Sequence, residues 1–103
     1  MPTIFVTIMK ASYIIEVSIK TIRGYTAFCH YQLGSIPNDA ERIFACMKGA
    51  PVNANGDAPF QINLIWQSSI KTVTLATQFC TLAELKENSH YISREVFKLL
   101  NLE

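Results

Sequence analysis

The sequence has few charged residues and no cluster of either sign. Charged side chains make up 17% of the 103 residues, and the formal net charge is +1. Globular proteins usually carry about 25% charged residues, so we expect part of this surface to be covered by a partner. The nine Lys and Arg residues are scattered along the chain. A nucleic-acid interface needs a basic stripe to neutralise phosphates, so the composition argues against nucleic acid as a partner.

Cysteine, histidine and aspartate are scarce too, and their spacing fits no known kind of site. Cys29, Cys46 and Cys80 are odd in number and far apart, which argues against a disulfide framework and a zinc site and favours the reducing cytosol. No apolar run is long enough to cross a bilayer. Phosphate loops, dinucleotide fingerprints and nucleophile elbows are absent. We therefore expect no catalytic residue, metal or cofactor, no membrane partner and a cytoplasmic protein.

The most regular pattern lies between Ala58 and Cys80. Alternation of apolar and polar residues from Phe60 to Gln67 indicates a half-buried strand. A second such run follows the polar link Ser68-Ser69, so the stretch predicts a β-hairpin. The inner face of this hairpin is predicted to carry these residues: Phe60, Ile62, Leu64, Trp66, Val73, Leu75 and Phe79.

A similar hairpin is predicted nearer the N-terminus. Residues Ser12–Ile22 and Tyr25–Leu33 alternate in the same way, and Arg23-Gly24 between them supplies a turn. Residues 1–10 are predicted to form a loosely held N-terminal strand or extension.

Helices are predicted after each hairpin. Asn38 and Glu41 have the spacing of a capping box, and Gly49 stands where a glycine would close that helix, before an exposed loop at 50–59. Thr81 and Glu84 form a second capping box, which predicts a helix from Leu82 to about Asn88. A last helix is predicted at 94–101, with Ser93 as its cap and a hydrophobic staple between Ile92 and Phe97.

These elements predict a single α+β domain over residues 1–103. We expect an antiparallel four-stranded sheet of two hairpins, in ββα-ββα order, with two to three helices packed on one face. The opposite face of an antiparallel sheet is usually polar, but here the alternation places Ile14, Phe28 and Ile65 on it. These three residues are the predicted interface of a non-enzymatic protein-interaction or assembly module, a homodimer or a complex with another protein. The alternative is a small-ligand-binding domain or small enzyme with a site near Cys80, His30 and Asn63.

Overall fold

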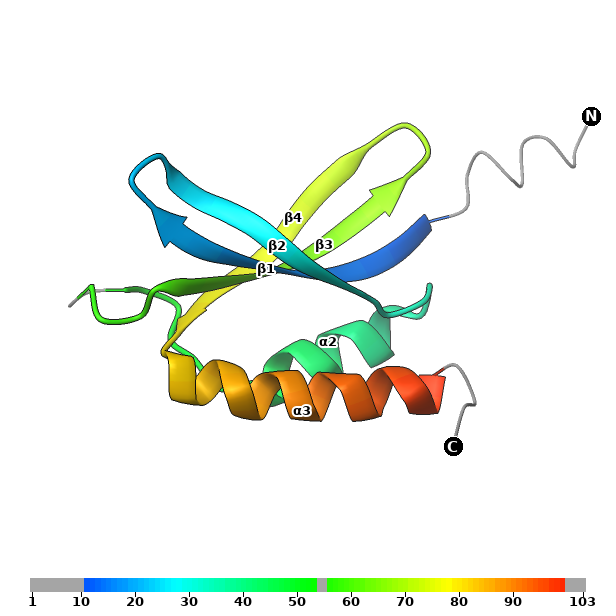
Figure 1. The fold of residues 1–103 in the computed structure, drawn as a ribbon. Helices are drawn as coiled ribbons and strands as arrows, with labels where there is room; N and C mark the ends of the chain where they lie inside the picture. The colour runs from blue at the N-terminus through cyan, green and yellow to red at the C-terminus, as the bar shows by residue number, and fades with distance from the viewer. Residues whose placement is uncertain (1–10, 54–55, 100–103) are drawn as a thin grey trace, which may run out of the picture.

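Four strands and two helices account for most of the part of the chain that the structure describes (Figure 1). This computed structural model describes residues 11–53 and 56–99, so the strand predicted near the N-terminus lies outside the described residues. In chain order the elements are β1 (Ala11–Thr21), β2 (Gly24–Gln32), α2 (Pro37–Cys46), β3 (Phe60–Ser68), β4 (Thr72–Cys80) and α3 (Leu82–Leu99).

The strands form one antiparallel sheet in the order β2-β1-β3-β4, so the two hairpins meet along β1 and β3. Both helices lie on the same side of this sheet (Figure 1). The predicted α+β class and antiparallel sheet are therefore confirmed.

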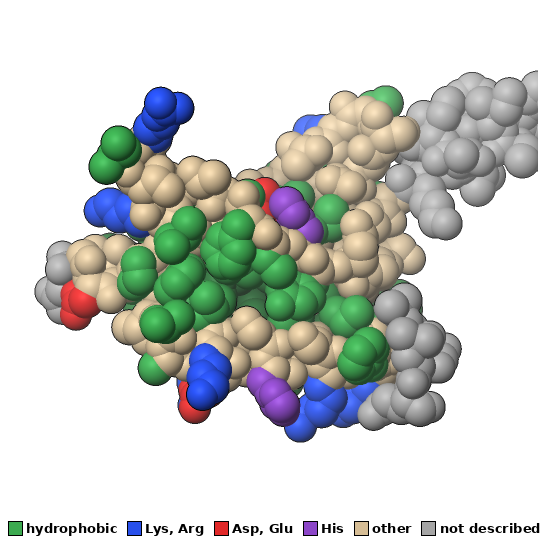
Figure 2. Space-filling view, in the orientation of Figure 1, with side chains coloured by type: hydrophobic (Ala, Val, Ile, Leu, Met, Phe, Trp, Pro, Cys, Tyr) green, Lys and Arg blue, Asp and Glu red, His purple; other side chains and the backbone are tan. Residues whose placement is uncertain are grey.

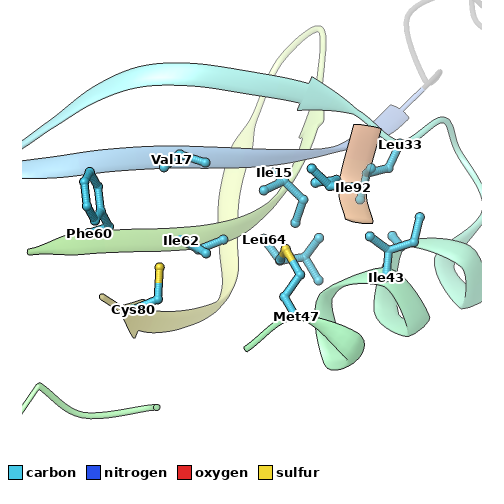
Figure 3. Packing of buried hydrophobic residues seen from close by; sticks show 11 residues of the cluster. Ile15, Val17, Leu33, Ile43, Met47, Phe60, Ile62, Leu64, Cys80 and Ile92 are labelled. Atoms are coloured by element: carbon cyan, nitrogen blue, oxygen red, sulfur yellow. The ribbon is translucent and has the colours of Figure 1, made fainter. Parts of the chain in front are cut away.

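The core fills the space between the sheet and the helices. From β1 and β3, the side chains of Ile15, Ile62 and Leu64 point toward Ile43 of α2 and Ile92 of α3 (Figure 3). All five of these side chains are at most 3% exposed. Alternation in β1 and β3 places every second residue on this face, which is why these two central strands supply most of the residues that the sheet contributes to the core.

A β-bulge in β2 changes the facing that the sequence predicts for Phe28. Val17 pairs with Cys29 and Ser18 pairs with Ala27, so Phe28 is an extra residue without a partner on β1. Its ring centroid lies 6.2 Å from that of Phe60, a core residue on the helix side. The prediction that Phe28 faces away from the helices is wrong, because a bulge interrupts the period of two.

A second bulge lies in β4 and changes the facing of that strand. Leu64 pairs with Ala76 and Ile65 with Thr74, which leaves Leu75 as the extra residue. Leu75 is 50% exposed and does not belong to the core, contrary to the prediction. Phe79 was also expected on the inner face, but its pairing with Gln61 places it on the face away from the helices.

The sheet curls away from the helices. Tyr25 of β2 and Phe79 of β4 belong to the two edge strands, yet their ring centroids are only 5.8 Å apart. Figure 1 shows the turn ends of both hairpins, β1–β2 and β3–β4, rising away from the helices. The face away from the helices is therefore concave, and residues at its centre are enclosed by the edge strands.

Helix α2 begins differently from the prediction. It starts at Pro37, and the preceding Ile36 makes no side-chain capping bond, so the predicted capping box at Asn38 is wrong. Proline suits the first helical position because its fixed φ is helical and the missing N–H has no helical partner there.

Gly49 does not close α2, which ends at Cys46. The segment after the helix instead passes close to β4, where Ala50 and Phe79 exchange backbone hydrogen bonds of 2.9 and 2.8 Å. A Cβ on Gly49 would lie 2.8 Å from the carbonyl oxygen of Phe79, so glycine is required here by close approach of two backbones.

Helix α3 begins as predicted and continues further. Its capping box is confirmed, since Glu84 N–H donates to Thr81 Oγ1 at 3.2 Å and Thr81 N–H donates to Glu84 Oε1 at 2.9 Å. The helix then runs without a break through Ser93 to Leu99, so the predicted second helix and its cap are wrong. Phe97 is 53% exposed while Ile92 is buried, so these two residues form no staple.

Replacing Thr81 by alanine should lower the free energy of unfolding by about 1 kcal/mol, because a first-turn N–H of α3 loses its side-chain acceptor. Urea denaturation measures this loss. Thr72→Ala, at the exposed start of β4, is the control and should have a smaller effect. Equal small effects at both positions would contradict the role assigned to the cap.

Two buried polar side chains of α3 join it to α2 and the residues that follow α2. Asn88, 3% exposed, donates to the carbonyl oxygen of Lys48 at 2.8 Å and accepts from its backbone N–H at 2.7 Å. Glu95, 6% exposed, forms ion pairs with Arg42 at 2.9 Å and Lys98 at 3.2 Å. The hydrogen bond from Arg42 is the main reason that the pKa of Glu95 is lowered.

Candidate functional site

A row of polar side chains crosses all four strands on the concave face. His30 Nε2 of β2 lies 3.3 Å from Glu16 Oε2 of β1. The other carboxylate oxygen of Glu16 accepts a hydrogen bond of 3.2 Å from Asn63 Nδ2 of β3. Thr77 Oγ1 of β4 completes the row by donating to Asn63 Oδ1 at 2.7 Å. The structure thus brings together two of the residues predicted for a ligand site, His30 and Asn63, through a carboxylate that the sequence analysis did not include.

The row is partly open to solvent. The side chain of His30 is 55% exposed and that of Glu16 is 24% exposed, so a small polar molecule can reach the imidazole and one edge of the carboxylate. Within residues 11–53 and 56–99, no group of three or more His, Cys, Asp or Glu side chains has the geometry to hold a metal ion. The row can therefore position hydrogen-bond donors and acceptors, and it also ties the edge strands to the centre of the sheet.

Cys80 does not join this row. It is fully buried and pairs with Phe60 on the side of the sheet that faces the helices. Burial is the main cause that raises the pKa of its thiol to about 11, and the negative charge of Glu84 acts in the same direction. The thiol is protonated at neutral pH and out of contact with solvent, so it is not a nucleophile in the folded protein.

Cys80 should therefore react with thiol reagents only after unfolding. A thiol pKa that is raised in the folded state means that the unfolded state loses its proton first, so this group lowers stability as pH rises from 9.0 toward about 11. Alkylation of the native protein near neutral pH, followed by mass spectrometry, should modify exposed Cys46 and leave Cys80 intact. All three thiols should react after denaturation, and rapid modification of native Cys80 would contradict its burial.

Two hollows on the surface lie apart from the polar row. One, of about 710 Å³, is lined by Lys48 and by four residues of α3: Ala83, Lys86, Glu87 and His90. The other, of about 260 Å³, lies between the loop after α2 and the start of α3, beside Phe79 and Glu84. Both are open, and neither is lined by His30, Asn63 or Cys80. A ligand of the polar row would therefore bind on the concave sheet itself.

The predicted interface residues do not form one patch. Ile14 and Ile65 are direct partners across β1 and β3 on the concave face, but they are only 6% and 7% exposed. Phe28 is 56% exposed and lies on the other side of the sheet, against Phe60. The structure brings the two isoleucines together and separates the phenylalanine from them.

An apolar surface surrounds Phe28 instead. Ile19, 39% exposed, is paired with Phe60 in the sheet, and the ring of Phe28 lies on the same phenylalanine. We call exposed Ile19 and Phe28, together with Phe60, which is itself only 8% exposed, the Phe28 surface. Figure 2 shows that hydrophobic side chains extend over the area between hairpin β1–β2 and the first turns of α3. Ile19 and Phe28 thus lie at the end of the core that the helices leave open, and they are themselves exposed to solvent.

Neither of the described helices is long and apolar enough to cross a membrane. No protein-family model matches the chain, and comparisons with curated proteins and with solved structures give no match either.

Proposed function

We propose that the protein is a non-enzymatic interaction or assembly module that forms a homodimer through the Phe28 surface. One observation carries the proposal: a phenylalanine that is 56% exposed lies over a buried core residue at the open end of the core. Leaving a ring of this size in water forgoes about 1.5–3 kcal/mol relative to burying it. Aromatic side chains that fill such positions are the usual anchors of protein interfaces.

A second copy of the chain is the partner that fits this surface best. The Phe28 surface has no charged member, so two copies can meet face to face without repulsion, and a two-fold axis lets one surface serve both subunits. The cytosol is the compartment that fits, since the three cysteines are free.

Light scattering at micromolar concentration tests the proposal. We expect a dimer for the wild type and a monomer for Phe28→Glu, because the substitution places a charge at the centre of the interface. The matched control is Leu75→Glu, which changes the extra residue of the other β-bulge, also half exposed, and should leave the dimer intact. A monomeric wild type, or a dimer that survives Phe28→Glu, would refute the proposal.

The polar row supports a second candidate, binding of a small polar ligand on the concave face. Its basis is the continuous contact from His30 through Glu16 and Asn63 to Thr77. In a thermal-shift screen of small polar molecules, a molecule that binds the row should then raise the melting temperature of the wild type. His30→Ala should abolish that shift while the unliganded melting temperature changes little, because His30 is exposed. Equal shifts in both proteins would exclude the row as the site.

A further inference from the structure

Each hairpin ends in a turn that presents an isoleucine to solvent. Ile22, between β1 and β2, is 103% exposed, and Ile70, between β3 and β4, is 76% exposed. Figure 1 shows both turns raised away from the helices, on the same side of the sheet. One flat surface above the sheet can therefore meet the two turns at once.

The side chains of these two isoleucines add little to the packing of the fold, because both are largely exposed. Turns favour Gly, Pro, Asn, Asp and Ser, because these residues suit the backbone or bond to it, whereas β-branched residues favour strands. A single exposed apolar residue is ordinary. Two of them, each at the outermost point of a hairpin, are better explained by contact with something outside the protein.

Basic residues accompany both isoleucines. Arg23 follows Ile22, Lys71 follows Ile70, and Lys20 lies at the end of β1 close to the first turn. These three side chains form no ion pair with any residue in the described part of the chain. Neither of the stretches 17–38 and 58–83, which contain the turns, has an Asp or Glu. Figure 2 shows a hydrophobic group with Lys or Arg near it at both hairpin ends.

We propose that the two hairpin turns dock on a phospholipid bilayer with anionic headgroups. Ile22 and Ile70 enter the interface between headgroups and acyl chains, while Lys20, Arg23 and Lys71 bind the phosphate and carboxylate groups. The expectation that a membrane is no partner was based on the lack of a spanning segment. Peripheral docking needs no such segment, and it does not use the Phe28 surface.

Co-sedimentation with vesicles tests this docking. The wild type should bind vesicles of phosphatidylcholine with phosphatidylserine, should bind phosphatidylcholine alone much less, and should be released by salt. Replacing both Arg23 and Lys71 by glutamine should lower the partition coefficient about thirtyfold, since each charge contributes about 1 kcal/mol near an anionic surface. Replacing both Ile22 and Ile70 by serine should lower it at least about tenfold.

Matched controls use residues away from the turns. Val52→Ser removes an apolar side chain that is 67% exposed in the loop after α2. Lys86→Gln removes a charge at an exposed position of α3. Both should bind vesicles like the wild type, and all variants should melt like it. Equal binding to vesicles with and without phosphatidylserine would overturn the proposal. Retention of vesicle binding by the double isoleucine variant would also overturn it. So would binding of DNA or RNA that competes with vesicles and is unchanged by the two isoleucine substitutions.

Discussion

Leu64→Ala should lower the free energy of unfolding by about 2–5 kcal/mol, as expected when a buried leucine is truncated and leaves a cavity. Leu64 is 3% exposed and lies at the centre of the core, between the partners Ile15 on β1 and Ala76 on β4. Both neighbouring strands are fixed by their own hydrogen bonds, so the backbone cannot move in to fill the space. Urea denaturation at constant pH gives the loss directly.

Leu75→Ala is the matched control for this experiment. The sequence pattern places both leucines on the inner face, but the bulge in β4 leaves Leu75 half exposed. Its truncation should therefore lower the free energy of unfolding by only about 0.5 kcal/mol, the range of surface substitutions. Comparable losses at the two positions would contradict the register of β3 and β4.

Asn88→Ala should lower the free energy of unfolding by about 2–4 kcal/mol, because it leaves two backbone groups of Lys48 without partners. The amide of Asn88 satisfies both the N–H and the carbonyl oxygen of Lys48, at 2.7 and 2.8 Å, and is itself buried. Urea denaturation measures this loss.

Asn38→Ala provides the comparison. Asn38 lies in the first turn of α2, is exposed and makes no side-chain hydrogen bond with the described residues. Alanine there should change stability by no more than about 0.5 kcal/mol. If Asn38→Ala lowered the free energy of unfolding as much as Asn88→Ala or more, the hydrogen bonds between Asn88 and Lys48 would not stabilise the fold as we expect.

The sequence predicted the parts of the fold that depend on local patterns. Alternating residues predicted both hairpins, and the capping box at Thr81 and Glu84 predicted where α3 begins. The bulges could not be predicted, because one extra residue in a strand has no local signal and appears only when the partner strand is known. Phe28 and Leu75 were therefore assigned to the wrong faces.

The candidate site shows the same division between local and distant information. Alternation within a strand cannot show that Glu16 and Asn63 meet, because their contact depends on the pairing of β1 with β3, and the two residues are 47 positions apart in the sequence. The burial of Asn88 and Glu95 could not be predicted either, because their hydrogen-bond partners, Lys48 and Arg42, lie in or just after α2, far away in the sequence. Ser93 resembles a helix cap in sequence, yet packing of α3 on the sheet keeps the helix continuous.

The two β-bulges also affect how readily another chain could pair with the edges of the sheet. The edge strands β2 and β4 contain no Asp, Glu, Lys, Arg or Pro, the residues that usually prevent an edge from adding another chain. A bulge in each of them disturbs the regular spacing of outward N–H and C=O groups that an incoming strand would need. We therefore expect the bulges to hinder copies of the chain from joining edge to edge, a form of association distinct from the side-chain contact proposed for Phe28.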